Sequence, residues 1–226
     1  MEQVRERVPV RDCWSQEARP QRHSLRDQVL SALRGSLVSG ELSPGVVYSA
    51  PALAARFEVS ATPVREAMQQ LVREGAVEVV HNRGFRVASR SVRDLAELAE
   101  VRALIEVPVV LRLARSVPSE RWETLRPLAD ASMDAAAHGD RAAYAEADRA
   151  FHGALLGLDG NAQLVTVAGD LHRRAQWPSA AGPRPHPAQL VADATEHGVL
   201  LDALADGDLP VVESLVREHF AGAFGA

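Results

Sequence analysis

One carboxylate and three imidazoles in the second half of the sequence could together bind a metal ion. Asp148 and His152 are four residues apart in AEADRAFHGAL, so a helix would place both side chains on one face. His197 follows in ATEHGVLLDAL and His219 in VREHFAGAF. Such a set suits Zn²⁺ or another borderline divalent ion, with open positions for water or a ligand. The spacing alone is weak evidence, because His197 and His219 could equally be partly buried histidines without a metal.

The elements that must position these residues are predicted to be helices. Apolar residues recur at helical spacing over residues 91–115, 118–138, 140–157, 161–177, 187–206 and 208–223. Polar and glycine-containing breaks separate the segments, and residues 178–187 form one long proline-rich loop. Ser91 can cap the first of these helices, and Pro108 is expected to kink it. Six helices with polar breaks predict an antiparallel bundle.

The first half of the chain has a different pattern. Apolar residues four apart indicate a helix from Ser24 to a break at Gly40, and a second short helix ends near Phe57. A third helix begins after a possible cap at Ser60 or Thr62 and ends at Gly75. Strands at residues 76–80 and 85–88 then flank the turn HNRG. Two helices joined by a short turn and followed by a hairpin predict a winged helix-turn-helix, which binds DNA.

The stretch VSATPVREAMQQLVREGAVEVVHNRGFRV resembles the DNA-binding domain of the GntR family of bacterial repressors. The resemblance implies that the recognition helix and the wing tip contact DNA through Ser60, Thr62, Arg65, His81, Asn82 and Gly84. The physical chemistry agrees, since arginine can bind guanine with two hydrogen bonds and glycine permits close approach to the minor groove. An exposed arginine that contacts only solvent is the alternative for Arg65.

Two positions depart from the family pattern. Relatives usually carry arginine directly after the serine of this motif, where this chain has Ala61, and near the start of the preceding helix, where it has Pro51. Each change removes a DNA contact worth about 1–3 kcal/mol if it is base-specific. We therefore expect either an unusual operator or weaker binding that depends on Arg65, the wing and dimer avidity.

The all-helical second half resembles the FadR subfamily, whose C-terminal domain is called FCD. Many members of that branch bind a metal through an Asp-x-x-x-His pair and two later histidines, and Asp148, His152, His197 and His219 fall at the matching positions. The resemblance also implies that Arg102 faces the cavity and binds the carboxylate of an effector. The alternative is a surface arginine paired with Glu106, four residues later. His172 is not chosen as a ligand, because Arg173 and Arg174 suggest a solvated edge.

Composition and charge limit the class of protein. No apolar run approaches the roughly 18–20 residues needed to span a bilayer, and the N-terminus lacks the apolar segment of a signal peptide. With Cys13 as the single cysteine, a cytoplasmic protein without membrane association is expected. Residues 1–90 hold 13 Arg and 10 acidic residues, whereas residues 91–226 hold 12 Arg and 20 acidic residues. A mildly basic first half beside an acidic second half fits one nucleic-acid-binding domain.

These observations predict a mainly α chain in three parts. Residues 1–22 form a mobile arm, residues 23–89 a DNA-binding domain, and residues 90–226 a helical domain for effector binding and dimerisation. The leading hypothesis is a homodimeric regulator, most simply a repressor, that binds a palindromic double-stranded DNA operator. It would sense a small organic acid at a divalent metal, Zn²⁺ or else Ni²⁺ or Mn²⁺. The alternatives are a metal-dependent enzyme and a regulator that senses the metal itself.

Overall fold

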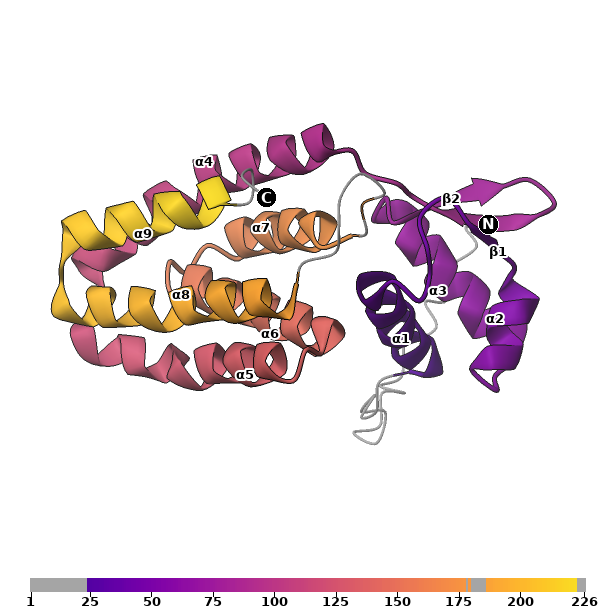
Figure 1. Cartoon of the computed structure of the whole chain (residues 1–226), viewed down its shortest axis with the longest axis horizontal. Helices are drawn as coiled ribbons and strands as arrows, with labels where there is room; N and C mark the ends of the chain where they lie inside the picture. Colours follow the sequence, from indigo (N-terminus) through magenta and orange to yellow (C-terminus); the bar gives the residue numbers. More distant parts are fainter. Residues whose placement is uncertain (1–23, 178, 180–185, 223–226) are drawn as a thin grey trace, which may run out of the picture.

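A computed structural model describes residues 24–177, 179 and 186–222, which form two units joined at residues 88–91 (Figure 1). We call residues 24–89 the head and the described residues from 90 onward the helical domain. They correspond to the predicted winged helix-turn-helix and the predicted antiparallel bundle. The expected arm, residues 1–22 with Cys13, lies outside the described residues.

The head contains the three predicted helices and the predicted hairpin. In chain order its elements are α1 (Leu25–Ser39), β1 (Val47–Tyr48), α2 (Ala50–Arg56), α3 (Ala61–Arg73), β2 (Val77–Val80) and β3 (Gly84–Val87). Ser24 caps α1 by accepting a hydrogen bond from the Asp27 N–H, and Gly40 ends α1 in the left-handed conformation. Gly75 follows α3 at φ 71°, as predicted. Ser60 precedes α3, but its side chain makes no capping hydrogen bond.

The sheet has one strand more than the sequence predicted. Its order is β1-β3-β2, and both pairs are antiparallel. A two-residue strand such as β1 is too short to show an alternating pattern, so only its pairing with β3 defines it. Gly84, expected in the turn, pairs with Val80 as the first residue of β3. It has φ 127°, and a Cβ there would lie 2.3 Å from the Tyr48 carbonyl oxygen. The close approach of β1 therefore requires glycine.

The helical domain has the predicted helices, with one correction. Its elements are α4 (Val92–Ser116), η1 (Ser119–Leu125), α5 (Arg126–Ala137), α6 (Arg141–Gly157), α7 (Ala162–Ala175), α8 (Pro187–Asp206) and α9 (Leu209–Gly222). The single helix predicted over 118–138 is wrong, because a 3₁₀ helix, η1, occupies its first third. Pro127 lies in the first turn of α5, where a missing N–H costs nothing, and its ring disfavours an α-helix running into it.

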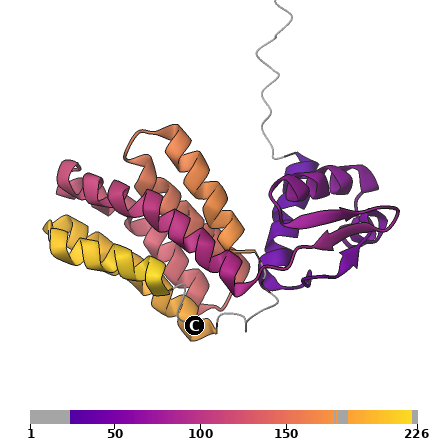
Figure 2. The same ribbon diagram turned by 90° about the horizontal axis from the view of Figure 1, so that it is seen from above.

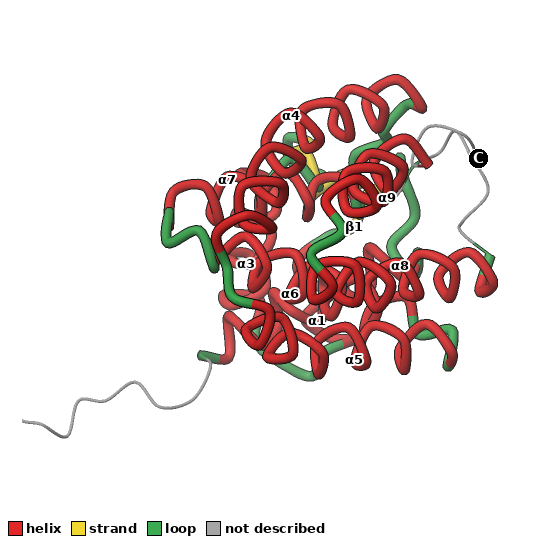
Figure 3. Tube along the Cα trace, turned by 90° about the vertical axis from the view of Figure 1, so that its left-hand side faces the viewer, coloured by secondary structure: helices red, strands yellow, loops and turns green. Residues whose placement is uncertain are grey.

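Helix α4 connects the two units. Ser91 and Asp94 form a capping box, with the Ser91 Oγ accepting from the Asp94 N–H and the Asp94 carboxylate accepting from the Ser91 N–H. The helix then continues through Pro108 for 25 residues. Viewed along the bundle, α4 and α9 lie next to each other at one edge (Figure 3).

The two units touch at a second place besides the chain connection (Figure 2). Helix α1 packs on α6, where a Cβ at Gly35 would lie 3.6 Å from the Cβ of Ala142. Trp177, which follows α7, is 4% exposed and packs with the core of the head rather than with the bundle. No helix in the described part of the chain has both the length and the apolar character needed to cross a membrane.

Candidate functional site

The outer face of α3 carries the candidate DNA-binding residues. Val64 and Met68 are fully buried on the inner face, whereas Ser60, Thr62 and Arg65 are exposed. The Arg65 guanidinium has no hydrogen-bond or ion-pair partner among the described residues. The amphipathic pattern of α3 thus leaves these side chains available to an external partner.

The wing presents a second exposed group. His81 and Asn82 are exposed at its tip, and Asn82 adopts the left-handed conformation with φ 57°. Gly84 is half-buried, and its contact with Tyr48 gives it a structural reason that is independent of DNA. Arg83 is also exposed at the tip but was not among the residues predicted to contact DNA. Its place in the four-residue turn was the available signal.

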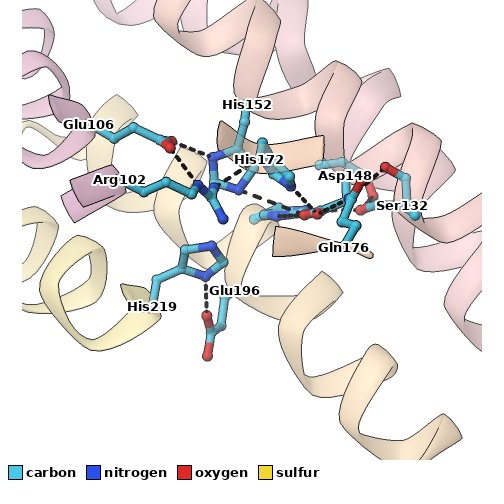
Figure 4. Close-up of polar contacts among 12 residues, drawn as sticks. Arg102, Glu106, Ser132, Asp148, His152, His172, Gln176, Glu196 and His219 are labelled. Atoms are coloured by element: carbon cyan, nitrogen blue, oxygen red, sulfur yellow. Dashed lines mark hydrogen bonds and ion pairs between the residues drawn. The ribbon is translucent and has the colours of Figure 1, made fainter. Parts of the chain in front are cut away.

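The helical domain brings the predicted metal ligands together from three helices, and Figure 4 shows Asp148, His152 and His219 among them. Asp148 and His152 come from α6, His197 from α8 and His219 from α9. One ligand atom from each histidine can be chosen so that all three lie within 4.8 Å of one another. An ion about 2.1 Å from each donor requires separations of no more than about 4.2 Å. Small side-chain adjustments would therefore close the group around an ion.

Each of the three histidines uses Nδ1 to contact an oxygen outside the group. His152 Nδ1 lies 3.2 Å from Glu106 Oε2, His197 Nδ1 lies 2.9 Å from Ser132 Oγ, and His219 Nδ1 lies 2.6 Å from Glu196 Oε2. This leaves Nε2 as the remaining ring nitrogen of every histidine. Outer oxygens that hold the second nitrogen are the usual way in which proteins orient metal-binding histidines.

The hydrogen-bond network also assigns the protons. The Ser132 hydroxyl donates its single proton to the Ala129 carbonyl at 2.7 Å, so His197 must donate from Nδ1 to Ser132. His152 likewise donates from Nδ1 to the Glu106 carboxylate, which can only accept. In neutral rings, Nε2 of both histidines then carries a lone pair, and both atoms are buried without a hydrogen-bond partner among the described residues.

Asp148 completes a group of lone pairs that face one another. Its Oδ1 lies 3.2 Å from His197 Nε2 and 3.7 Å from His152 Nε2. A carboxylate oxygen and imidazole lone pairs repel when nothing positive lies between them. Buried polar atoms need a partner, and a cation between Oδ1 and the two nitrogens would supply one.

His172 is buried, so the prediction of a solvated edge is wrong. It is 3% exposed, and its Nε2 lies 2.6 Å from Asp148 Oδ2, which also accepts from Gln176 at 3.2 Å. Ala168, four residues earlier, is buried too; this spacing was the missed signal, whereas Arg173 and Arg174 lie to one side of that face. His172 positions the carboxylate of Asp148 and leaves Oδ1 to the inner group.

Arg102 fits neither of the two alternatives considered from the sequence completely. It forms the expected pair with Glu106, with Nε donating to Oε1 at 2.8 Å. The pair is not on the surface, because the Arg102 side chain is 11% exposed and that of Glu106 is 2% exposed. Its Nη2 also donates to His172 Nδ1 at 3.0 Å, and its guanidinium lies 5.1 Å from the Phe220 ring centroid. Arg102 is therefore already bound on two sides.

The ionisation of these groups follows from burial and from their partners. Burial alone would raise the pKa of the Glu106 carboxyl, but the His152 hydrogen bond and the Arg102 charge lower it to about 2. Burial lowers the pKa of His152 to about 3, so this ring is neutral at pH 7. Burial would also lower the pKa of His219, but the Glu196 hydrogen bond raises it above its usual value. A metal would displace a proton from His219 more readily as the pH rises.

A small cavity adjoins the histidines. It encloses about 20 Å³, and its polar lining is Glu106, His152, Glu196, His197 and His219. A space of roughly 10–15 Å³ is enough for one water molecule. The cavity therefore fits an ion or a water, whereas an organic acid would require the walls to move. Arg102 lies behind this lining and is not part of it.

Comparison with known proteins gives consistent matches for both units. Residues 25–87 match bacterial regulatory proteins of the gntR family, and residues 97–222 match the FCD domain. A probable D-xylose utilization operon transcriptional repressor of Paenarthrobacter nicotinovorans is 28% identical over 200 residues, which are 88% of this chain and 87% of the relative. An uncharacterized HTH-type transcriptional regulator in an unstable DNA locus of Streptomyces ambofaciens is 30% identical, with 88% and 83% covered. The solved structure of E. coli McbR/YncC has a TM-score of 0.69 at 26% identity, over 88% of this chain and 94% of that chain.

Proposed function

Because the chain belongs to the GntR family of bacterial regulatory proteins and carries an FCD domain, it is a DNA-binding transcriptional regulator and not an enzyme, and we propose that it is a metal-dependent, ligand-released repressor. In this proposal a cytoplasmic homodimer binds a palindromic operator through its two heads. A small organic acid reaches a divalent ion in the helical domain and weakens operator binding. A relative named as a repressor supports the sign of regulation.

In the proposed complex the first turn of α3 enters the major groove of the operator. Ser60, Thr62 and Arg65 contact phosphates and base edges there, while His81 and Asn82 approach the minor groove from the wing, where Gly84 shapes the tip. The free Arg65 guanidinium and the uncommitted Ser60 hydroxyl support this assignment. Ala61 is half-buried against the head core, so no side chain replaces the arginine usual at that position.

The DNA-binding assignment can be tested with the region flanking the protein's own gene. We expect Arg65→Ala to weaken binding to this DNA by about 1–3 kcal/mol, or roughly 5- to 150-fold. Arg121→Ala, which removes an exposed arginine of the helical domain, should leave the affinity unchanged. Equal affinities for the Arg65→Ala variant and the unchanged protein would contradict the assignment.

The metal proposal rests chiefly on the inward-facing lone pairs of Asp148, His152 and His197. These residues and His219 would hold the ion, and a bound Zn²⁺ would offer open positions to a carboxylate oxygen. The chain's own part is to orient the ligands through Glu106 and the other outer oxygens. Ni²⁺ and Mn²⁺ are alternatives, because histidine and carboxylate ligands also suit these ions.

The metal can be tested by elemental analysis of purified protein. We expect about one divalent ion per chain in the unchanged protein and its loss in His152→Ala. His138→Ala, at an exposed position after α5, should retain the ion. Protein that carries no divalent metal and does not bind any on titration would contradict the proposal.

The effector proposal concerns a small carboxylate that replaces water on the ion. Arg102 could bind a second polar group of this effector only if its guanidinium also kept its bond to Glu106. A thermal-shift screen of organic acids tests this, because a ligand at 100 times its Kd stabilises the folded state by about 2.7 kcal/mol. A stabilising acid should lose its effect in both Arg102→Ala and His152→Ala. Retention of the full shift in either variant would contradict the proposed site.

A regulator that senses the metal itself is the second candidate, and the small cavity favours it. A space of about 20 Å³ suits an ion without any organic ligand. The two candidates differ when a chelator is added at a fixed carboxylate concentration. For a metal sensor, the chelator changes the DNA affinity even without the acid. For an acid sensor, the chelator abolishes the change in DNA affinity that the acid causes.

A further inference from the structure

The outward face of α4 carries an apolar stripe that is largely exposed in the described chain. Leu104 is 71% exposed, more than any other large apolar side chain among the described residues, and Val101 is 42% exposed. Pro108 is also exposed and Leu111 is half-buried. These four residues, which we call the α4 stripe, follow one another at spacings of three, four and three. That spacing aligns them along one side of a helix.

Charged residues extend the stripe at both ends. Glu97 lies four residues before Val101, and Arg115 lies four residues after Leu111. Both side chains are exposed, and the local pair between Arg93 and Glu97 is solvent-exposed, so it opposes a new contact only weakly. The alternating spacing of four and three residues from 97 to 115 is that of a coiled-coil seam.

The stripe is complementary to a second copy of itself in the antiparallel direction. If two α4 helices pair around residue 106, Val101 meets the partner's Leu111 and Leu104 meets the partner's Pro108. The same register places Glu97 opposite the partner's Arg115, twice in the dimer. Glu100 and Arg112 lie six residues from the centre, so each is about 18 Å along the helices from its own copy. One register thus pairs apolar with apolar and acid with base.

A groove beside the stripe can receive partner side chains. It lies between α4 and α9, has a volume of about 560 Å³ and is lined by Leu104, Pro108 and Leu111 together with Phe220 of α9. An isologous two-fold contact buries the same patch on both copies, which suits a groove and a protruding leucine on one surface.

We propose that the homodimer of this protein forms through antiparallel pairing of the two α4 helices over residues 97–115. The partner is a second copy of the chain, because this register places Glu97 of each copy opposite Arg115 of the other. This inference deepens the proposed function, since it rests on a dimeric repressor and names the surface that joins the subunits.

The location of this interface explains how the site can act on DNA binding. Arg102 and Glu106 lie on the opposite face of the same helix and hold His172 and His152. The capped start of α4 at Ser91 leads directly to the head. A ligand that shifts Arg102 would therefore move a helix fixed between the site, the partner and the head. The spacing of the two heads would change with it.

The interface can be tested by the molar mass of the full chain in light scattering without DNA. We expect the unchanged protein to be a dimer and Leu104→Glu to show a twofold lower molar mass. Val199→Glu, which adds the same charge at an exposed valine of α8, should remain dimeric. Leu104→Glu should keep the helical circular dichroism spectrum of the unchanged protein, which would show that the bundle is folded.

A charge exchange tests the register through surface residues that should not affect folding. Glu97→Arg alone and Arg115→Glu alone each place like charges opposite each other twice, and we expect both to shift the protein toward monomer. The double variant Glu97→Arg, Arg115→Glu restores opposite charges and should recover the dimer. A merely local role of these residues would not produce this recovery.

The outcomes separate the interface from the proposed function. A monomeric unchanged protein, or a dimer that persists in Leu104→Glu and in both single charge variants, would overturn the α4 interface. Failure of the double variant to recover the dimer would overturn the register. None of these results depends on metal content or DNA affinity, whereas the metal and effector proposals fail on those measurements alone.

Discussion

The head and the helical domain assemble their candidate functional residues in different ways. The residues proposed to contact DNA fall within 25 consecutive positions, 60–84, on one helix and the adjoining wing. The proposed metal ligands extend from Asp148 to His219 on three helices, and their outer partners come from α4, α5, α7 and α8. The function of a local motif can be recognised from the order of its residues. The function of a site built from distant helices can be recognised only once the packing of those helices is known.

The difference in construction does not make the head independent. Trp177, which follows α7, packs within the core of the head. The Gln176 amide beside it donates to Asp148 Oδ2 at 3.2 Å. Neighbouring residues thus connect the head core to the candidate site, in addition to the connection through α4.

Removal of the Trp177 side chain tests whether the head depends on the helical domain. We expect Trp177→Ala in the full chain to lower the free energy of unfolding of the head by about 3–5 kcal/mol, measured by circular dichroism in urea. Trp177→Phe should cost less than about 1.5 kcal/mol, because the indole N–H has no hydrogen-bond partner among the described residues. If the alanine variant unfolded like the unchanged protein, the head would be independent.

Substitution of Gly84 tests the local construction of the wing. Gly84→Ala should destabilise the head by about 2–3 kcal/mol, because a side chain at φ 127° is strained and its Cβ would meet the Tyr48 carbonyl. Gly45→Ala is the control, since Gly45 also has positive φ, 77°, but no atom lies within 4 Å of the added Cβ. A smaller loss of stability in Gly45→Ala, measured by thermal unfolding, would show that the contact with Tyr48 adds to the cost of the backbone strain. Equal losses would contradict the role of β1.

Removal of the His172 ring tests the non-local construction of the metal site. We expect His172→Ala to weaken metal affinity by about 10- to 100-fold, because Asp148 Oδ2 loses its 2.6 Å partner. The affinity can be measured by competition with a chromophoric chelator. Total loss of binding, as expected for His152→Ala, would indicate that His172 is a ligand, and an unchanged affinity would show that Asp148 needs no such support. His138→Ala again serves as the control.

Two serines at helix starts provide the smallest and most direct contrast. Ser91→Ala should lower the stability of the helical domain by about 1 kcal/mol, because it breaks the capping box of α4. Ser60→Ala should change stability by much less, since the Ser60 side chain makes no capping bond, but it should weaken operator binding. Thermal unfolding and DNA titration of both variants test the pair. A stability loss in Ser60→Ala equal to that in Ser91→Ala would contradict this division of roles.

Much of the fold was predictable because the decisive interactions are short-range. The cap at Ser24, the glycine at position 75 and the box at Ser91 and Asp94 act within a few residues, so their signals stand together in the sequence. The strand β1 was missed because its only definition is its pairing with β3, about 40 residues later. The start of α5 was misplaced although Pro127 was visible, because the apolar pattern continues across the 3₁₀ helix.

The candidate site was predictable in its residue types but not in its connections. Sequence spacing and family resemblance pointed to Asp148, His152, His197 and His219, and the structure brings these four together. Because arginines follow His172 in the sequence, its burial was not predicted. The pairing of Arg102 with Glu106 suggested an exposed pair, but both side chains lie inside the helical domain. Burial decides both cases, and burial depends on which helices pack over a residue.

The sequence by itself thus determined the order of the main helices, the hairpin of the wing and the DNA-binding motif, because local hydrogen bonds and side-chain periodicity govern these features. Only the tertiary structure decided which nitrogen of each histidine faces inward, which partner holds Asp148, and that Arg102 is already bound. Those properties arise from contacts between helices far apart in the chain. The outward stripe of α4 combines both levels, since its spacing is local but its exposure depends on the packing of the bundle.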